Sequence, residues 1–298
     1  MCKIAVLLSS YNGEEYIEEQ IESIYKQTYT DFELYIRDDG SDESFQYQLR
    51  ALQERYGFYL ELGENIGFVN SFMELLSKVK NADLYAFADQ DDIWLENKLQ
   101  VAVDWFEEQN YQSDRPLLFH SAYDVIGIGR DVIERFYFPN DDYDFRRSIT
   151  ENHYSGFSMI VNTQMKAMML RGEPEKIGYH DWWAAMIAQA FGVGYSDKRV
   201  MALHRSHGDN VTTFNFSTRC VWLKKTLSEE SELRRRAKEF QRCFFDELSE
   251  ENQKILKLFC WNKYSFSVAI KKMFYPKRWR PVWSSEIIIR ILMLVGKI

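Results

Sequence analysis

The residue cluster with the clearest chemical potential is Ala88–Trp94, which reads ADQDDIW. The three carboxylates within four residues, Asp89, Asp91 and Asp92, repel one another unless a cation lies among them. Residues two apart beyond a strand point to the same side, so we expect Asp89 and Asp91 to act together and Asp92 to point elsewhere or to cap the next helix. Carboxylate oxygens suit Mg²⁺ or Mn²⁺. The spacing alone agrees equally well with a solvated acidic turn.

Other polar clusters precede this one. The stretch Ser9–Glu14 reads SSYNGE, Asp38–Glu43 reads DDGSDE, and Asn65–Phe68 reads NIGF. Asp-Gly and Asn-Gly are also common in simple turns, so none of these segments defines a site by itself.

The elements that must position these clusters alternate between strand and helix. The hydrophobic pattern predicts strands over 3–9, 32–37, 58–62 and 84–88, and helices over 14–27, 41–56 and 67–79. This alternation indicates an α/β fold with a parallel sheet. Ligands of such sheets bind beyond the carboxyl ends of the strands, where the clusters at 9–13, 38–42 and 89–92 are expected. Later segments predict strands over 117–124, 157–162 and 200–204 and a helix over 181–190.

Composition and charge describe a globular protein with two unlike parts. With 46% hydrophobic and 28% charged residues, disordered and fibrous classes are excluded. Residues 1–218 carry a net charge of −17 and residues 219–298 one of +9, and half of the eight tryptophans lie in the second part. We therefore expect a main domain over 1–215 and a helical, basic-aromatic appendage over 216–298.

Cysteine and hydropathy patterns bear on location. The four cysteines have no metal-ligand spacing, no secretory leader opens the chain, and no apolar run reaches the ~20 residues of a membrane span. These features predict a cytoplasmic protein with free thiols. The apolar end at 293–298 is also compatible with continuation into a longer protein.

The four motifs occur in the order SSYNGE, DDGSDE, NIGF and DQDDIW, and this order resembles the nucleotide-sugar glycosyltransferases of family 2. The resemblance covers residues 1 to about 212 and implies a GT-A fold with a mainly parallel central sheet. It also implies transfer of a sugar from a nucleoside diphosphate to an acceptor hydroxyl. The donor-binding residues it implies are Ser10, Tyr11, Asn12, Asp38, Asp39, Asn65, Gly67, Asp89 and Gln90.

The resemblance assigns further residues to the cation and the leaving diphosphate. Asp91 matches the metal ligand of the Asp-x-Asp motif, which would hold Mn²⁺ or Mg²⁺. The segment 203–211, LHRSHGDNV, resembles a late loop in which His207 completes the metal site and Arg205 pairs with phosphate oxygens. His204 departs from the aromatic residue usual at its position and receives no role.

On the acceptor side, Gly178–Trp183 reads GYHDWW and places Asp181 where the family carries its catalytic base. An inverting transfer needs one such base. Trp94, Trp182 and Trp183 are expected to offer flat faces to sugar rings. The structural alternative is that Asp181 caps a helix and the tryptophans are core. Gly156 precedes a strand where a small residue often lies near the sugar, although a simple turn explains it as well.

The appendage interleaves basic and aromatic residues at 234–236, 271–272 and 277–283. This composition fits an anionic membrane surface, an acidic glycan or lipid-diphosphate acceptor, or the acidic domain of another copy in a homo-oligomer. A solvated helical face with buried tryptophans fits as well. Nucleic acid is not expected, because no recognition motif is present and the main domain is acidic.

The resemblance implies an inverting, metal-dependent glycosyltransferase, and the form DQDDIW resembles that of many bacterial rhamnosyl- and hexosyltransferases. Such an enzyme would move rhamnose, glucose or galactose from a UDP- or dTDP-linked donor to a lipid- or protein-linked bacterial cell-surface glycan. Two alternatives remain. One is a non-catalytic glycan-binding or assembly protein of the same fold. The other is a sugar nucleotidyltransferase or hydrolase, against which the absence of Lys and Arg from residues 9–15 argues.

Overall fold

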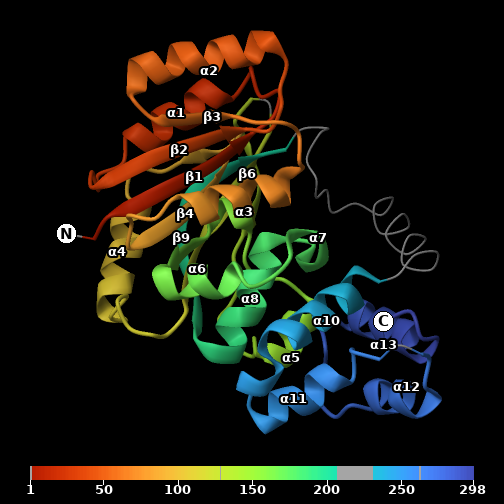
Figure 1. Cartoon of the computed structure of the whole chain (residues 1–298). Coiled ribbons are helices and arrows are strands. Elements are labelled where there is room, and N and C mark those ends of the chain that lie inside the picture. Colours follow the sequence, from red (N-terminus) through yellow and green to blue (C-terminus); the bar gives the residue numbers. More distant parts are fainter. Residues whose placement is uncertain (1, 128, 207–230, 262) are drawn as a thin grey trace.

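The computed structural model describes residues 2–127, 129–206, 231–261 and 263–298 (Figure 1). The strands are β1 (Ile4–Ser10), β2 (Phe32–Asp38), β3 (Tyr59–Leu62), β4 (Leu84–Asp89), β5 (Ile93–Trp94), β6 (Leu117–Ile126), β7 (Val132–Phe136), β8 (Ile160–Asn162) and β9 (Val193–Arg205). The helices of the first part are α1 (Ile17–Tyr25), α2 (Glu43–Tyr56), α3 (Phe68–Lys78), α4 (Lys98–Glu108), α5 (Phe145–Thr150), α6 (Thr163–Met169), α7 (Pro174–Ile177) and α8 (His180–Phe191). The C-terminal helices are α10 (Glu232–Phe244), α11 (Glu250–Lys257), α12 (Phe266–Met273) and α13 (Trp283–Leu294), and short 3₁₀ turns lie at Gly156–Ser158 and Phe245–Glu247.

The sheet has the order β3-β2-β1-β4-β8-β6-β9-β5, with β7 paired to β6. Strands β3, β2, β1 and β4 are parallel, as the strand-helix alternation predicted. Strand β8 runs antiparallel between β4 and β6, and β6 and β9 are again parallel. The α/β class with a mainly parallel sheet is thereby confirmed.

Two hydrophobic layers cover the two faces of the sheet. In β1, Ile4 packs into the layer that contains α1, α2 and α4, whereas Leu7 packs into the layer that contains α3, α6 and α8. Alternate side chains of a strand point to opposite faces, so a continuous apolar run is what a strand buried on both sides requires. The run Ile4–Leu8 meets this requirement because all its side chains are buried.

The C-terminal helices share the second of these layers. Phe240 of α10 contacts Trp183 of α8 with ring centroids 5.3 Å apart, and it lies equally close to Phe145 of α5. Thr150 donates a hydrogen bond of 2.9 Å to the carbonyl of the buried Trp279. Helices α10–α13 gather at the end of the molecule away from α2 (Figure 1). The predicted boundary at 215 falls within residues 207–230, outside the described residues.

Two strand predictions differ from the structure. The segment 157–162 is a 3₁₀ turn followed by the short β8, and the predicted strand at 200–204 is the end of the longer β9. The first half of β9 contains Asp197, Lys198 and Arg199, which break the hydrophobic pattern. Pairing with β6 forms this half nonetheless, with register shifts at Ser121–Tyr123.

Within the part of the chain that the structure describes, no helix combines the length and the hydropathy needed to cross a bilayer.

Candidate active site

Strands β1, β2 and β4 end side by side at the same edge of the sheet. Ser10 is paired in register with Asp38, and Ser9 with Asp89. The three polar clusters that follow these strands therefore meet at one edge, as the sequence predicted.

Side chains tie these loops together. The Gln90 amide accepts a hydrogen bond of 2.8 Å from the Tyr11 N–H and donates one of 3.0 Å to the Tyr11 carbonyl. Asn12, at a φ of 43°, bonds through its N–H to Ser41 Oγ and through Oδ1 to the Asp42 N–H. Gln90 and Asn12 thus hold the backbone of the loops after β1 and β2 in place. The Tyr11 ring is left half exposed to solvent.

A glycine leaves room for this contact. A Cβ built on Gly13 would lie 2.4 Å from the Gln90 side-chain oxygen. Any larger residue would push Gln90 away from Tyr11.

Asp38 and Asp39, expected to accept hydrogen bonds from a nucleoside, are both buried and already bonded within the protein. Asp38 accepts from the N–H and hydroxyl of Ser41 and from Gln46. Asp39 accepts from the N–H groups of Ile66, at 3.0 Å, and Gly67, at 2.8 Å. The structure therefore gives both aspartates a loop-holding role, and any nucleoside contact has to share their oxygens.

Asn65 and Gly67 lie in the exposed loop that Asp39 holds. Gly67 is the N-cap of α3 at a φ of 84°, a conformation that favours glycine. The Asn65 backbone approaches Gly40 so closely that a Cβ there would lie 2.5 Å from its nitrogen. The NIGF segment thus seats this loop against the loop after β2.

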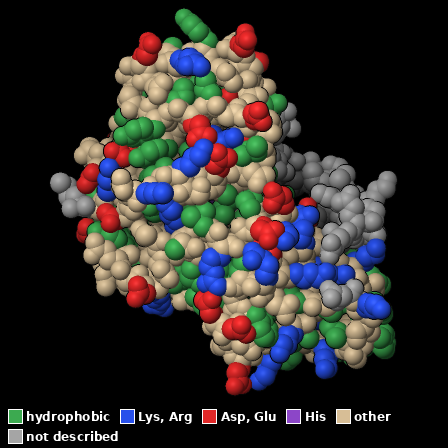
Figure 2. Space-filling model, viewed as in Figure 1, with side chains coloured by type: hydrophobic (Ala, Val, Ile, Leu, Met, Phe, Trp, Pro, Cys, Tyr) green, Lys and Arg blue, Asp and Glu red, His purple; other side chains and the backbone are tan. Residues whose placement is uncertain are grey.

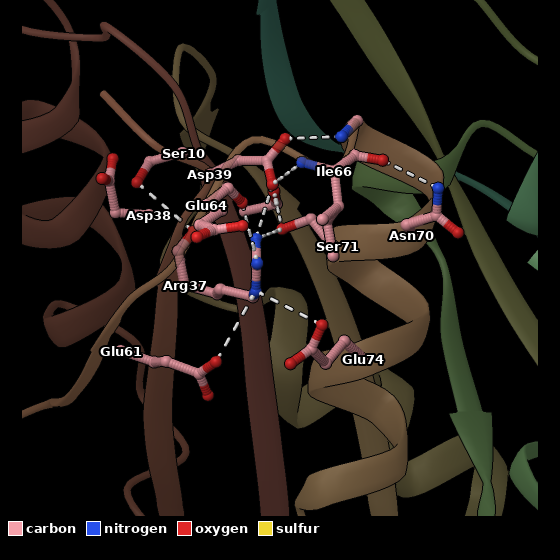
Figure 3. A network of polar contacts seen from close by, with 12 residues as sticks. Ser10, Arg37, Asp38, Asp39, Glu61, Glu64, Ile66, Asn70, Ser71 and Glu74 are labelled. Atoms are coloured by element: carbon pink, nitrogen blue, oxygen red, sulfur yellow. Dashed lines mark hydrogen bonds and ion pairs between the residues drawn. The ribbon is translucent and has the colours of Figure 1, made fainter. Parts of the chain in front are cut away.

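A buried arginine that the motifs did not indicate joins these loops (Figure 3). Arg37 Nη1 lies 2.5 Å from Asp39 Oδ1 and 3.2 Å from Ser71 Oγ, and Nη2 donates to the Glu64 carbonyl at 3.1 Å. Glu61 and Glu74 approach its Nε at 3.7 and 3.8 Å. Arg37 therefore neutralises Asp39 and links the loop after β2 to the Glu64 loop and to α3 at the carboxyl edge of the sheet.

Arg37→Met is expected to lower the free energy of unfolding by about 3–5 kcal/mol, because it leaves the Asp39 carboxylate buried without its cation. Chemical denaturation measures the change. The control is Arg55→Met, which breaks the exposed pair with Glu18 and is expected to cost less than ~1 kcal/mol. Equal losses of unfolding free energy in the two variants would show that the buried Arg37 pair contributes no more to stability than the exposed Arg55 pair.

The acidic motif forms one compact cluster. Asp89, Asp91 and Asp92 each present an oxygen, and these atoms lie within 4.8 Å of one another. Asp92 was expected to point away or to cap a helix, but it is buried in the cluster, and the next helix, α4, has Asn97 at its N-cap. Burial, together with the charges of Asp92 and Asp91, raises the pKa of Asp89 well above its usual value.

His204 supplies a charge partner that the sequence had not assigned. Its Nδ1 lies 2.7 Å from Asp92 Oδ1, and its ring stacks on Phe157 at 4.7 Å. Burial opposes its protonation, but the Asp92 charge and hydrogen bond outweigh it and raise the pKa of His204 to about 9. The pairing of β5 with β9 brings the two residues together, and the local pattern of neither strand revealed it.

Asp181 lies in the first turn of α8, near enough to Asp89 of the acidic cluster for its charge to act on that residue. Its Oδ1 accepts a hydrogen bond of 2.6 Å from the Trp182 N–H, and the Gly156 N–H and the Asn152 side chain also donate to its carboxylate. The N-cap of α8 is Tyr179 and makes no side-chain capping bond, so Asp181 is not the helix cap.

Burial raises the pKa of Asp181 to about 6, and the surrounding hydrogen bonds and Arg236 limit the rise. The charged or titratable groups that face it from other elements are Asp89 of β4, Tyr123 of β6 and Arg236 of α10. A carboxylate with a pKa near 6 is suited to take up a proton near neutral pH.

Gly156 leaves room for this arrangement. A Cβ there would lie 2.8 Å from Nε2 of the buried His180. A larger residue at this position would have to displace the buried His180 ring or the turn whose N–H donates to Asp181.

Arg236 comes from the C-terminal part, where the basic run 234–236 had been assigned to the surface or to a partner. Its side chain is only 1% exposed, and its Nε donates a hydrogen bond of 2.7 Å to the Ile177 carbonyl. The guanidinium lies 3.8 Å from the ring centre of Trp182. Its two terminal nitrogens find no hydrogen-bond partner among the described residues. The appendage thus places a desolvated cation beside Asp181.

Two of the three predicted acceptor aromatics are corrected by their burial. Trp183 is fully buried against Phe240 and Phe244, and Trp94 is 2% exposed in the opposite hydrophobic layer. A ring without an exposed face cannot stack on a sugar. Trp182 remains partly exposed, although Arg236 covers one face of its ring and Nε1 bonds to the Ser148 carbonyl.

The late loop is described only in part. Arg205, expected at the phosphates, is buried against α1, where it pairs with Glu19 and lies over the Tyr16 ring. In this structure Arg205 pairs with a carboxylate of the protein, and its contact with phosphate oxygens stays a prediction. His207 lies outside the described residues. Ser10 is buried behind the edge, with its hydroxyl 3.5 Å from the Arg37 carbonyl.

A strand-helix sheet with an acidic cluster at its carboxyl edge and a further carboxylate, Asp181, that acts on the cluster electrostatically is the arrangement expected of a GT-A glycosyltransferase. The family model described as glycosyl transferase family 2 matches residues 5–165. The chain belongs to this family and is an enzyme of the glycosyltransferase class.

One relative spans most of the chain. The dTDP-rhamnosyl transferase RfbG of Shigella flexneri is 24% identical over 262 residues, which cover 83% of this chain and 87% of the relative. The extent of this match over both chains agrees with their membership of one family.

Solved structures share the fold. Staphylococcus aureus TarS 1–349 in complex with UDP-GlcNAc superposes with a TM-score of 0.58 at 18% identity, over 98% of this chain and 81% of that one. The mannosyltransferase PcManGT of Pyrobaculum calidifontis, in complex with GDP-Man and Mn²⁺, gives 0.52 at 16% identity, over 86% and 68%. The TarS likeness, at 98% of this chain, includes the C-terminal helices as well as the sheet.

Proposed function

We propose that this enzyme is an inverting, metal-dependent glycosyltransferase. It transfers rhamnose, or alternatively glucose or galactose, from a dTDP- or UDP-linked donor to a hydroxyl group of a bacterial cell-surface glycan, lipid- or protein-linked. The observation that carries the proposal is the proximity of two acidic sites: the Asp89-Asp91-Asp92 cluster at the sheet edge, and Asp181 in the first turn of α8, whose charge acts on Asp89. Rhamnose is placed first because RfbG, a relative that matches 83% of the chain, is named for it.

The acidic cluster has the features of a divalent-metal site. Its oxygens lie within 4.8 Å of one another, and the buried Oδ2 of Asp92 has no hydrogen-bond partner among the described residues. Hard oxygen ligands in this number suit Mn²⁺ or Mg²⁺. Asp91 would be the principal ligand, and the ion when bound would offset charge on the departing diphosphate.

The nucleoside would lie along the loops after β1 and β2. The half-exposed Tyr11 ring offers a face to the base, and Gln90 and Asn12 hold the loop that carries it. Asp38, Asp39, Asn65 and Gly67 shape the neighbouring wall, and Asp89 lies where the ribose would meet the cluster. These residues bind and orient the donor before chemistry.

Asp181 would act as the general base. Its carboxylate takes the proton of the acceptor hydroxyl as the oxygen attacks the anomeric carbon. The bond from that carbon to the diphosphate oxygen breaks on the opposite face, and the diphosphate leaves with the electron pair. Attack from behind inverts the anomeric configuration. The partly exposed Trp182 beside Asp181 is the remaining candidate for acceptor contact.

The test is sugar release from a panel of dTDP-, UDP- and GDP-sugars with Mn²⁺, with an EDTA control. Metal-dependent turnover of one donor would support the proposal and name the donor. Turnover unchanged by EDTA would contradict the metal-dependent mechanism. Nucleotide binding without turnover for any donor and acceptor would favour a binding or assembly protein instead.

The cytoplasmic location and a homo-oligomer stay predictions.

Arg236 is proposed as a positioning residue for this base. Arg236→Met is expected to lower kcat by about 10- to 100-fold and to move the acidic limb of the pH profile to higher pH, because the cation that favours ionised Asp181 is lost. Arg236→Lys keeps the charge and should restore the position of the limb. A kcat loss with an unmoved limb would assign Arg236 to packing of Trp182 alone.

A further inference from the structure

The last helix, α13, turns its apolar side to solvent. Trp283, Ile287, Ile288, Ile291 and Val295, the last just beyond its end, are between 44% and 67% exposed. Their spacing places them on one side of a helix. A surface helix ordinarily buries such a stripe.

The charged residues of α13 face inward instead. Glu286 is buried and accepts hydrogen bonds from the Trp279 and Arg280 N–H groups. Arg290 lies 2.5 Å from Glu286 through its Nε, and its terminal nitrogens donate to backbone carbonyls, including that of Tyr275. The polar groups of this helix are therefore used to attach it to the protein, and its outer face carries no charge.

Further exposed hydrophobic side chains lie on and beside α12, which packs against α13. Tyr264, Phe266 and Phe274, at and beyond its ends, and Val282 before α13 are between 52% and 70% exposed. We call these four residues, with the five of α13, the apolar face.

Basic side chains accompany the apolar face. Residues 261–298 contain eight Lys and Arg residues and one acidic residue, the buried Glu286. Lys263, Lys271, Lys277 and Arg278 are exposed. The Arg278 guanidinium lies 4.7 Å from the ring centre of the exposed Trp283. Figure 2 shows Lys and Arg side chains gathered over the part of the molecule that holds α10–α13, with hydrophobic side chains between them.

We propose that the apolar face docks onto an anionic lipid bilayer, with its aliphatic and aromatic side chains in the interfacial layer and the basic residues on the headgroups. Exposed aromatic residues next to lysine and arginine suit the boundary between headgroups and acyl chains. Anionic headgroups complement the excess of positive charge, whereas a second copy docked face to face would bring like charges together. Helix α13, of 12 residues, is too short to span the bilayer and lies along it.

The docking goes beyond the proposed transferase function and is independent of the donor and acceptor. The experiment is co-sedimentation of the full chain with vesicles of phosphatidylcholine alone or of equal parts phosphatidylcholine and phosphatidylglycerol. Binding is expected only to the anionic vesicles and is expected to weaken as salt is raised.

Three variants test which residues carry the binding. W283S/I287S/I291S is expected to lower the partition coefficient more than about 10-fold. K271Q/K277Q/R278Q is expected to lower it by about 100-fold at low salt. The control V132S/I133S removes two equally exposed apolar residues of β7 and should bind as the wild type does.

The outcomes separate the proposal from its competitors. Circular dichroism and thermal melting verify that the variants remain folded. Unchanged binding by W283S/I287S/I291S, or equal binding of the wild type to neutral vesicles, would overturn the proposal. A dimer that this variant dissociates, without vesicle binding by the wild type, would assign the face to a second copy. Donor hydrolysis is measured in parallel and should be the same in all three variants without vesicles, so loss of docking is distinguishable from loss of catalysis.

Discussion

Asp91→Asn is expected to lower metal-dependent turnover by at least ~10³-fold while the protein remains folded. The substitution keeps the size of the side chain but removes one negative charge from a cluster whose oxygens lie within 4.8 Å of one another. A divalent cation bound there loses affinity, and with it the offset of charge on the departing diphosphate. Turnover of the donor identified in the panel, measured over a range of Mn²⁺ concentrations, checks the prediction.

The stability of this variant gives an independent readout. Without metal, three crowded carboxylates repel one another, and this repulsion adds to burial in raising the pKa of Asp89. Asp91→Asn should therefore melt no lower than the wild type when both are treated with EDTA. Calorimetric titration should show loss of Mn²⁺ binding, and Asp114→Asn, at an exposed residue, is the matched control. Full turnover with undiminished Mn²⁺ affinity in Asp91→Asn would remove this residue from the metal site.

The sequence predicted the catalytic edge because its information there is local. β1 and β4 are short apolar runs, β2 alternates between apolar and polar residues, each is followed directly by polar residues, and parallel strands end at the same edge. The first loop, the Asp38–Glu43 turn and the acidic cluster could thus be placed together without knowledge of any long-range contact. The same local reasoning put Asp181 at the start of a helix, where the structure has it.

The supporting interactions could not be predicted, because each depends on residues far apart in the chain. Arg37 meets Glu64 and Ser71 only when β2 packs against α3, and His204 meets Asp92 only when β9 pairs with β5. Arg236 reaches Trp182 from a helix that composition had assigned to a separate appendage. No periodicity within a single element records these contacts.

Burial explains the tryptophan errors. The pair Trp182-Trp183 lies on a helix, where consecutive side chains point about 100° apart, so the two rings cannot both face an acceptor. The structure turns Trp183 into the core against α10, whereas Trp182 stays at the rim. Residue type alone identifies a suitable ring but does not say which of two neighbours is exposed.

Asp181→Asn is expected to lower kcat by about 10³- to 10⁴-fold, with donor and Mn²⁺ binding retained. Asparagine still offers an oxygen to the Trp182 N–H, although its NH₂ group cannot accept hydrogen bonds as the second carboxylate oxygen does, and it cannot take up the acceptor proton. Single-turnover transfer to the acceptor and nucleotide titration measure the two effects separately.

The pH profile distinguishes a base from a structural carboxylate. A general base is active when it is deprotonated. Because burial raises the pKa of Asp181 to about 6, kcat of the wild type should fall about tenfold per pH unit below pH 6. In Asp181→Asn the residual rate should lose this limb. The matched control is Asp144→Asn, because Asp144 caps α5 by accepting from the Arg147 N–H and touches none of the proposed site residues. Comparable losses in both variants would favour a role for Asp181 in holding its helix, whereas loss in Asp181→Asn alone, together with the vanished limb, requires a proton acceptor at this position.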